Sequence, residues 1–539
     1  MSWDASVDVV VVGFGGAGAC AALEARALDR SVLALDRFGG GGATAISGGV
    51  VYAGGGTHIQ QEAGVEDSTD AMFAYLKAEV QGVVSDATLR HFCDESVSNL
   101  RWLSDHGVPF RAALCPVKTS YPTDDYFLYY SGNEGFSPFR EIAKPAARGH
   151  RAVGTSLPGK NFYEPLRAAA LAAGVDVWTQ CRVRELIEDN GRVTGVLATR
   201  LRGAVARRHA RLEKLAIRLV NYVPRLAKRL RRMAARLEER HGEPCRVEAR
   251  GGVVLAAGGF IYNREMVKRY AEPYRRGMPL GTSGCGGLGI ELGRSVGGDV
   301  DRMGRVSAWR FLNPPEALVR GVLLNRSGAR YVNESLYGAA IGEAMVDHND
   351  GVGLLVIDDA IKRTAKSQVG RGRTQWFQTA PALLNLWFNC RRADSMEALA
   401  KVGGFDLNTL RTTLESYNAA IAADAPDAFG KELRQALRPP FYVMDCGIRS
   451  KVWPLPTLTL GGLVVDERDG QVLRTDRSGI EGLFAAGRNA VGICSRQYVS
   501  GLSIADCVYS GRRAGAAAAR RSSDVDPVGV RDPGAGGHG

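Results

Sequence analysis

The segment VDVVVVGFGGAGACAALEARALDRSVLALDR at residues 7–37 constrains the fold of this chain most strongly. It begins with five valines in six residues, which predicts a parallel strand buried on both faces. Gly13, Gly15 and Gly18 follow with the spacing G-x-G-x-x-G, and Asp36 ends the next strand. Glycines let the backbone approach a pyrophosphate, a helix N-terminus faces its charge, and the acid takes a ribose hydroxyl. This order of features predicts a dinucleotide site.

Later glycine-rich segments extend this prediction. The segment at residues 39–56 carries Thr44 and Ser47 among its glycines, as expected of a loop that wraps a flat cofactor rather than of a flexible linker. Two further units, GGVVLAAGGF and GIEGLFAAGRNAVGI, each read as a strand followed by glycine and are predicted to return to the same sheet.

The positions of these units predict an α/β fold in which one domain interrupts another. A discontinuous Rossmann-like domain is expected over residues 1–301 and 441–520, with an α+β capping or catalytic domain over residues 302–440. Residues 521–539 lack periodicity and are predicted to be disordered.

Composition narrows the class of protein. The ten cysteines include no C-x-x-C pair, which indicates neither a metal site nor a disulfide framework and favours reduced thiols. The first residues, MSWDASVD, lack the features of a secretory signal, and no apolar run approaches the ~18–20 residues that a membrane span needs. We therefore expect a cytoplasmic protein, either soluble or peripheral on the inner face of the membrane.

The net charge of +12 is concentrated in one insertion, residues 202–243. That segment has thirteen Lys or Arg and four Glu, which accounts for +9. Its apolar residues recur at helical steps, and Pro224 is expected to kink the helix or to separate two helices. The pattern fits a helix on an anionic membrane surface, a helix packed on the parent domain, or a subunit contact. Nucleic-acid binding is not expected, because Tyr222 is an isolated aromatic. The apolar stripe is Leu212, Leu215, Leu219, Val223, Leu226, Leu230, Met233 and Leu237.

Nine segments carry a family resemblance. In chain order they are VVVVGFGGAGACAA, SGGVVYAGG, VVLAAGGF, NRSGARYVNE, TLRTTLESYNAAI, DAFGK, PPFY, LGGLVVD and GLFAAGRNAVG. Together they resemble the FAD-dependent fumarate reductase/succinate dehydrogenase flavoprotein superfamily over residues 7–516. The resemblance implies FAD and a capping domain that closes over its isoalloxazine. No histidine lies within residues 39–56, so we expect FAD to be held non-covalently.

The resemblance assigns the candidate FAD-binding residues. They come from the glycine fingerprint, the loop after Asp36, the two strand-then-glycine units and the start of the last helix. They are Gly13, Gly15, Gly16, Ala17, Gly18, Asp36, Arg37, Thr44, Ser47, Gly48, Gly49, Ala257, Gly258, Gly487, Arg488, Gly501, Leu502 and Ser503. Arg488 stands where many relatives have a glutamate.

Departures from the dicarboxylate enzymes of this superfamily indicate an uncharged substrate. The element TLTLGG, residues 457–462, lacks the histidine that helps to bind a dicarboxylate. Cys494 and Tyr498 stand near the positions of a second histidine and of the arginine that grips a carboxylate. A buried carboxylate needs such cations.

The segment RQYVSGLSIADCVYSGRRAG instead resembles the 3-ketosteroid Δ4-(5α)-dehydrogenases. The resemblance makes Tyr498 the base and Ser500 its proton relay. It assigns carbonyl polarisation to Tyr337, and Tyr331 competes for that role from a position usually held by a core aromatic. In an extended segment the Tyr498 and Ser500 side chains point to the same side, so we expect their hydroxyls to touch. A helix that starts near Gly501 to Ser503 would direct its free N–H groups into the same site.

The resulting prediction is an FAD-dependent 3-ketosteroid Δ4-(5α)-dehydrogenase that acts on a CH–CH group. A Δ1-dehydrogenase or another desaturase of an apolar cyclic ketone is the alternative within the same scaffold. A flavoprotein that serves as a membrane-binding or interaction module is the alternative from a different class. The seven aromatic residues between Tyr121 and Phe139 either line a sterol pocket or belong to the core. The electron acceptor and the oligomeric state are left open.

Overall fold

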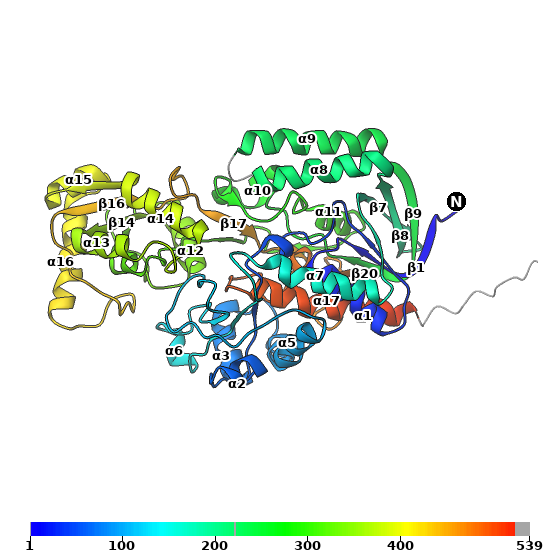
Figure 1. Ribbon diagram of the computed structural model, residues 1–539, viewed down its shortest axis with the longest axis horizontal. Helices are drawn as coiled ribbons and strands as arrows, with labels where there is room; N and C mark the ends of the chain where they lie inside the picture. The colour runs from blue at the N-terminus through cyan, green and yellow to red at the C-terminus, as the bar shows by residue number, and fades with distance from the viewer. Residues whose placement is uncertain (1, 220–222, 523–539) are drawn as a thin grey trace, which may run out of the picture.

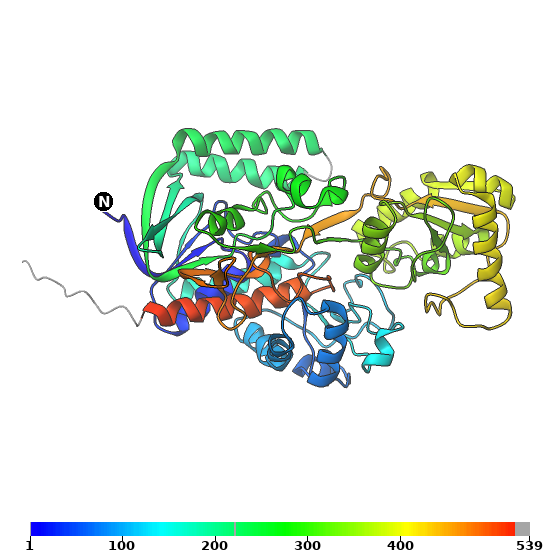
Figure 2. The ribbon, with the colours of Figure 1, turned by 180° about the vertical axis from the view of Figure 1, so that it is seen from behind.

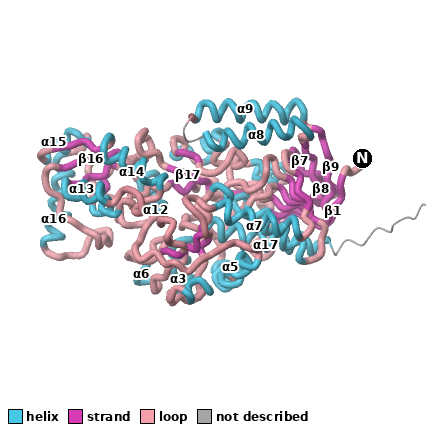
Figure 3. Tube along the Cα trace, in the orientation of Figure 1, coloured by secondary structure: helices cyan, strands magenta, loops and turns pink. Residues whose placement is uncertain are grey.

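The computed structural model describes residues 2–219 and 223–522, which form two lobes side by side (Figure 1). The larger lobe contains both ends of the described chain and the main sheet. The smaller lobe is built from the middle of the chain and includes α12 (Gly338–His348) and β16 (Phe441–Asp445). Figure 3 shows the strands gathered mainly in two places, one in each lobe.

A sheet of eight strands occupies the larger lobe of the described chain. Five of its strands run parallel in the order β6, β2, β1, β9 and β20, which agrees with the predicted Rossmann-like fold. The first part of β9 pairs antiparallel with β8, and its last residues pair in parallel with β20. The strands are β1 (Ala5–Val12), β2 (Val32–Leu35), β6 (Asp176–Trp178), β7 (Cys181–Asp189), β8 (Arg192–Arg200), β9 (Glu243–Leu255), β19 (Gln471–Leu473) and β20 (Gly479–Ala485).

Two helices from opposite ends of the chain pack together against this sheet (Figure 2). They are α1 (Gly16–Ala27) and α17 (Leu502–Arg521). Glycines make the contact close: a Cβ added at Gly511 would lie 2.5 Å from the Ala17 carbonyl oxygen, and one added at Gly515 would lie 2.2 Å from that of Ala21. The first and last segments of the described chain are therefore joined backbone to backbone.

The remaining elements of the larger lobe surround the sheet. Residues 44–172 form a helical cover with the small sheet β3–β5–β4, and β12 pairs with β17 beside it. These elements are η1 (Thr44–Ile46), β3 (Val50–Tyr52), α2 (His58–Glu62), α3 (Thr69–Val80), α4 (Asp86–Asp94), α5 (Ser96–Asp105), β4 (Leu128–Tyr129), α6 (Phe139–Ile142), β5 (Gly149–Arg151), α7 (Gly159–Ala172), α10 (Arg264–Tyr270), η2 (Glu272–Tyr274), β10 (Met278–Pro279), α11 (Leu288–Ser295), β11 (Val300–Asp301), β12 (Val306–Ala308), β17 (Pro456–Thr459), β18 (Gly462–Leu463) and η4 (Gly487–Asn489).

The smaller lobe has its own antiparallel sheet, in the order β13, β14, β16, β15, and its own apolar core. Strand β16 pairs within this sheet although it begins at residue 441, so the sheet extends beyond the predicted boundary at residue 440. The division into domains itself stays a prediction. The other elements of the lobe are η3 (Glu316–Arg320), β13 (Val322–Leu324), β14 (Leu354–Asp358), α13 (Asp359–Ser367), α14 (Trp376–Phe388), β15 (Cys390–Ala393), α15 (Met396–Gly403) and α16 (Leu407–Ala422).

The basic insertion forms two helices that lie against the larger lobe (Figure 1). They are α8 (Gly203–Leu219) and α9, which begins at Pro224 and ends at His241. On the inner side, Glu238 accepts hydrogen bonds from Arg37 at 2.8 Å and from His209 at 3.0 Å, and it pairs with Arg182 at 3.2 Å. Packing on the parent lobe is therefore the observed state of this segment, and its outer face is cationic.

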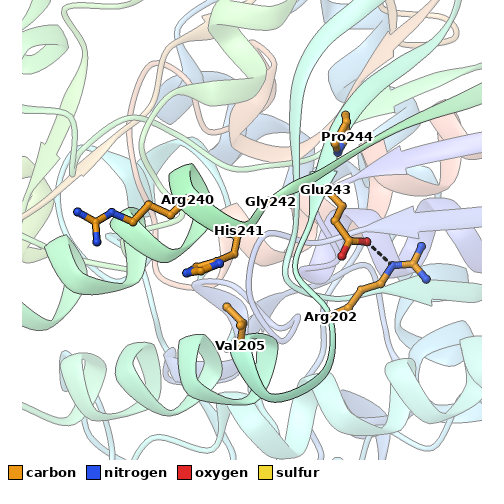
Figure 4. A pocket seen from close by; sticks show the side chains of 7 residues that line it. All are labelled: Arg202, Val205, Arg240, His241, Gly242, Glu243 and Pro244. Atoms are coloured by element: carbon orange, nitrogen blue, oxygen red, sulfur yellow. Dashed lines mark ion pairs between the residues drawn. The ribbon is translucent and has the colours of Figure 1, made fainter.

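A hollow of about 430 Å³ lies where α8 begins and α9 ends (Figure 4). Arg202 and Glu243 form an ion pair of 3.2 Å across it. Its other lining residues are Val205, Arg240, His241, Gly242 and Pro244.

The C-terminal prediction is partly wrong at its boundary. Helix α17 continues through Arg521, because alanines and glycines keep it packed on α1, whereas the tail was expected to be disordered from residue 521. Residues 523–539 lie outside the described part of the chain. Within the described ranges, no helix has the length and apolarity needed to span a bilayer.

The buried carboxylate of Glu238 gives a test of this packing. Burial raises the pKa of Glu238, but the hydrogen bonds of His209 and Arg37 outweigh it and lower that pKa from 4.5 to about 2. Replacing Glu238 with Gln is expected to cost about 3 kcal/mol of folding free energy at neutral pH, because two arginines and a histidine lose their buried anion. Urea denaturation measures this loss.

The pH dependence follows from the direction of the shift. Because the folded pKa lies below the unfolded one, the stabilisation is complete above pH 4.5 and is lost as the pH falls towards about 2. The difference between wild type and Glu238→Gln should shrink over that window. The neighbouring, exposed Glu239→Gln is the matched control and should change little. Equal stability of Glu238→Gln and wild type at pH 7 would contradict the assignment.

Candidate active site

The glycine fingerprint forms a tight turn between β1 and α1. Gly13 has φ +98°, and a Cβ there would lie 2.8 Å from the Ala256 carbonyl oxygen. A Cβ at Gly18 would lie 1.9 Å from the Gly13 carbonyl oxygen. At Gly15, the N-cap, α1 has no side-chain cap and no acidic residue in its first turn. Its first N–H groups therefore suit an anionic group such as a pyrophosphate.

Asp36 organises the loops around this turn. One carboxylate oxygen accepts the Phe14 N–H at 2.9 Å, and the other accepts the N–H groups of Phe38 at 2.8 Å and Gly40 at 3.1 Å. These three bonds leave part of the accepting capacity of the carboxylate for a ribose hydroxyl. Arg37, also assigned to the cofactor, instead forms an ion pair with Glu238 on α9.

The glycine-rich loop after Asp36 is fixed by its own side chains. Thr44 Oγ1 accepts the Gly16 N–H at 3.3 Å, so this loop contacts the start of α1. Ser47 Oγ donates to the Thr44 carbonyl at 2.8 Å and accepts the Gly49 N–H at 3.1 Å. The Gly48 carbonyl accepts a hydrogen bond of 2.8 Å from the hydroxyl of Tyr121.

Arg488 is a buried cation between the ends of β9 and β20. Its Nη2 donates to Cys285 Sγ at 3.5 Å, whereas its Nη1 has no hydrogen-bond partner among the described residues. The space beside the guanidinium is bounded by Gly258, whose added Cβ would lie 3.8 Å from it, and Ala17 and Gly487 contact each other nearby. A buried cation with no carboxylate partner among the described residues, next to a helix terminus that suits an anion, fits the anionic FAD, so the residues present are compatible with that cofactor.

Helix α17 begins at the predicted place. Gly501 is its N-cap with φ +91°, and a Cβ there would lie 2.6 Å from the Tyr52 nitrogen. The Tyr52 N–H donates to the Gly501 carbonyl at 3.1 Å. No side chain caps this helix, but the Leu502 N–H already donates to the Val499 carbonyl at 3.0 Å, which leaves the Ser503 N–H for a ligand.

Tyr498 lies immediately before this helix, in an aromatic group from three segments. Its ring centroid lies 4.9 Å from that of Trp309 and 6.5 Å from that of Tyr337. Burial raises the pKa of the Tyr498 phenol well above its usual value near 10, while the charge of Arg488 and the Gly501 N–H act in the opposite direction. The start of α17 thus supplies the favourable field that the sequence predicted.

Ser500 has different partners from those predicted. Its hydroxyl lies 3.1 Å from the Tyr129 hydroxyl, and its carbonyl accepts a hydrogen bond of 3.0 Å from Ser131. Among the described residues, no hydrogen bond joins Ser500 to Tyr498, so the expected direct contact is wrong. The turn into α17 starts at Ser500 and rotates its side chain away from the extended course.

Tyr337 completes the group from the smaller lobe. It precedes α12, and its backbone N–H donates to Asn133 Oδ1 at 2.6 Å. Burial raises the pKa of Tyr337, and a hydrogen bond from Ser500 opposes this rise. Tyr331, the competing residue, packs in the core of the smaller lobe and donates to the Val352 carbonyl at 3.2 Å. The geometry therefore favours Tyr337.

Two residues of the site were missed by sequence reasoning. Tyr129 lies within the aromatic stretch that was interpreted as either core or sterol lining, and only its partner Ser500 distinguishes it. Lys118 lies 5.8 Å from the centre of the Tyr337 ring and donates to the Tyr130 carbonyl at 2.9 Å. Burial lowers the pKa of Lys118 to about 8, although Glu134 and Glu79 oppose this effect. No sequence pattern marks this lysine.

Comparisons with known proteins agree with this arrangement. The FAD binding domain family matches residues 8–501. The 3-oxo-5-alpha-steroid 4-dehydrogenase of Comamonas testosteroni is 39% identical over 90% of this chain and 93% of its own length. The chain is also similar to the crystal structure of a 3-ketosteroid-delta4-(5alpha)-dehydrogenase from Rhodococcus jostii RHA1 in complex with 4-androstene-3,17-dione. That likeness has a TM-score of 0.79 and 31% identity, and it covers 96% of this chain and 98% of the other.

A more distant structure shares the fold. It is a 3-ketosteroid delta1-dehydrogenase from Sterolibacterium denitrificans, with a TM-score of 0.67, 19% identity, and coverage of 96% of this chain and 100% of the other. Taken with the family match, these likenesses confirm the predicted superfamily and its FAD cofactor. The chain belongs to the FAD binding domain family of flavoprotein oxidoreductases.

Proposed function

We propose that this chain is an FAD-dependent 3-ketosteroid Δ4-(5α)-dehydrogenase, which introduces the C4–C5 double bond into 3-keto-5α-steroids. The observation that carries the proposal is a cluster of four hydroxyl-bearing side chains at the start of α17, in a chain 39% identical to a 3-oxo-5-alpha-steroid 4-dehydrogenase. The four are Tyr498, Tyr337, Ser500 and Tyr129. Aromatic rings around Tyr498 favour an apolar substrate.

Each residue then has a role in desaturation. Tyr337 donates a hydrogen bond to the 3-keto oxygen, which acidifies the adjacent C4–H bond. Tyr498 takes the C4 proton, and the electron pair of that bond becomes the new C4–C5 double bond. FAD, when bound non-covalently beside Arg488 and the turn after β1, would supply the acceptor for the hydride of C5. Ser500 and Tyr129 hydrogen-bond to each other and orient Tyr337; for Ser500 to receive the proton of Tyr498, its hydroxyl would turn away from Tyr129.

The burial of the phenols suits this chemistry. A tyrosine is a poor base at neutral pH, and removal from water makes the proton of Tyr498 still harder to lose. Arg488 and the N–H groups at the start of α17 offset this cost because they stabilise negative charge at the same place. The absence of a histidine in Thr457–Gly462 fits an uncharged substrate: Thr457 and Thr459 there hold backbone groups of Met278 and Phe260.

Residues 202–243 are one candidate surface for peripheral contact with a membrane. The inner side of the two helices packs on the larger lobe, as described above. Leu215, Val223 and Leu226 stay exposed near the turn between the helices, beside exposed arginines. The outer face therefore suits attraction to anionic lipid.

Product analysis tests the proposed function. The purified yellow protein, incubated with a saturated 5α-3-ketosteroid and an artificial electron acceptor, should yield the 4-ene-3-one, identified by mass spectrometry and NMR. A 1-ene product would replace the Δ4 assignment with the Δ1 alternative. Intact FAD with no oxidation of the steroid would refute steroid desaturation.

Tyr498→Phe should lower turnover by about a hundredfold or more, because the proton acceptor is removed while the ring remains. FAD content, measured from the absorbance spectrum, should not change. In the wild type, flavin reduction measured by stopped flow should accelerate as the pH rises from about 7 to 10. The raised pKa of Tyr498 leaves most of the phenol protonated in that range, so the ionised fraction that acts as the base grows with pH. Tyr331→Phe, which removes a hydroxyl from the core of the smaller lobe, is the matched control and should keep full activity.

The link between Ser500 and Tyr129 can be measured with a double-mutant cycle. Ser500→Ala and Tyr129→Phe each remove one side of the same 3.1 Å hydrogen bond, so each should lower kcat by about tenfold. The double variant should lose little more than either single variant, because the bond can be lost only once. Fully multiplicative losses in kcat would show that the two hydroxyls act independently.

A further inference from the structure

Helix α14 carries the most exposed apolar face among the described residues, and no element of the described chain covers it. Trp376, Leu383, Leu384, Trp387 and Phe388 are all exposed; Trp387 retains 63% of its accessible surface and Phe388 retains 77%. Together with Ala380 they occur at positions i, i+4, i+7, i+8, i+11 and i+12, which is one face of a helix. An apolar face of this kind marks an interaction site.

The opposite face of α14 holds the helix firmly in place. Leu386 is fully buried in the core of the smaller lobe. At the C-terminal end, Asn389 donates to the Asp445 carbonyl at 2.8 Å. At the N-terminal end, Gln375 donates to Asp124 at 2.7 Å, on the larger lobe. The exposed face is therefore presented on a rigid helix tied to both lobes.

Charge around this face is mainly positive, although Asp359 pairs with Arg363 and Asp394 pairs with Arg392. Residues 361–392 contain seven Lys or Arg and no Asp or Glu. The Lys366 ammonium lies 4.2 Å from the centre of the Trp387 ring, and Arg371, Arg373, Arg391 and Arg392 are exposed. Tryptophan, phenylalanine and leucine on one face, with cations beside them, is the composition of helices that lie in the interface of an anionic bilayer. An exposed aromatic stripe beside an excess of cations suits an anionic lipid surface.

The position of the helix relates the face to the active site. Trp376 Nε1 donates to Ser156 Oγ at 2.7 Å, and Phe377 contacts Tyr121 with 5.8 Å between ring centroids. Tyr121 in turn lies 6.5 Å from Tyr129, whose hydroxyl is 3.1 Å from Ser500. Three aromatic rings in contact, those of Phe377, Tyr121 and Tyr129, thus lead from the start of α14 to the cluster of hydroxyl-bearing side chains in the site.

More exposed apolar residues adjoin these three rings. Leu157 follows Ser156, and Ile46 and Val117 lie in the loops that hold the Gly48 carbonyl and Lys118. All three have more than a third of their surface exposed. Exposed apolar residues therefore occur in the segments that contact Trp376 and Tyr121.

We propose that the exposed face of α14 docks on an anionic phospholipid bilayer. Docking would turn the entrance of the active site towards the bilayer. Trp387, Phe388, Leu383 and Leu384 would lie among the acyl chain ends of the interface, with the surrounding cations at the headgroups. A steroid dissolved in the bilayer would then reach the site along the three aromatic rings without crossing water. This last step rests on the proposed function; the docking does not.

Vesicle co-sedimentation tests the docking. The full chain with FAD is mixed with vesicles of phosphatidylcholine and phosphatidylglycerol in equal parts, and with vesicles of phosphatidylcholine alone. The wild type should bind the mixed vesicles more tightly. The double variant Leu384→Glu/Trp387→Glu should lose about tenfold or more in vesicle affinity, because two apolar anchors become charged. Leu171→Glu, an equally exposed leucine on α7, is the matched control and should bind like wild type.

Other results identify other surfaces and overturn the proposal. If Leu226→Glu on α9 abolishes vesicle binding and Leu384→Glu/Trp387→Glu does not, the basic insertion is the membrane contact. If the wild type does not bind vesicles and elutes as a dimer, whereas the double variant elutes as a monomer, the face joins two copies of this chain. A monomer that ignores vesicles also refutes the docking. Steroid turnover in detergent solution is measured separately, and its failure would leave vesicle binding by α14 intact.

Discussion

Contact of backbone with backbone, with no side chain between, is the constraint on which this structure depends. Gly18 brings α1 onto the turn after β1, and Gly511 and Gly515 bring α17 onto α1. Any larger residue at these positions would push the layers apart, because the neighbouring carbonyl oxygens lie at distances that no Cβ tolerates. The close packing fixes where α17 begins, and the residues just before it, Tyr498 to Ser500, are delivered to the nucleotide site as a consequence.

The hydroxyl-bearing side chains of the site come from segments that are distant in the chain. Tyr129 comes from β4, Tyr337 from the start of α12 and Tyr498 from the turn before α17. Their shared burial raises each phenol pKa, which keeps Tyr129 and Tyr337 protonated and able to donate but opposes the ionisation that Tyr498 needs as a base. The buried Arg488 is the opposing element, since a cation without a carboxylate partner is costly unless an anion is bound beside it. The same residue therefore favours the cofactor and eases the ionisation of Tyr498.

Positive charge serves two different surfaces of this molecule. At the α8–α9 insertion, Arg37, Arg182 and His209 pair with the buried Glu238, and the parent lobe partly covers the apolar stripe. Around α14, the cations flank large aromatic residues that are exposed. Charge alone attracts an anionic surface, but insertion needs exposed apolar area. The two surfaces differ in whether the apolar side of the amphipathic helix is packed against the rest of the fold or exposed.

The sequence by itself determined the nucleotide fold, the cofactor and the start of the last helix, because the glycine spacing and the valine run permit few other structures. It also identified Tyr498, Ser500 and Tyr337 as neighbours in one site. It missed Tyr129 and Lys118, whose contacts join residues that are far apart in the chain, and it placed the Ser500 hydroxyl on Tyr498 because an i, i+2 rule holds only in extended chain. It left the basic insertion open between a membrane surface, packing on the parent domain and a subunit contact, and it did not consider α14, since periodicity shows that a helix has an apolar face but not whether that face is buried. Only the tertiary structure decided these points, because side-chain partners and exposed faces depend on how the layers pack.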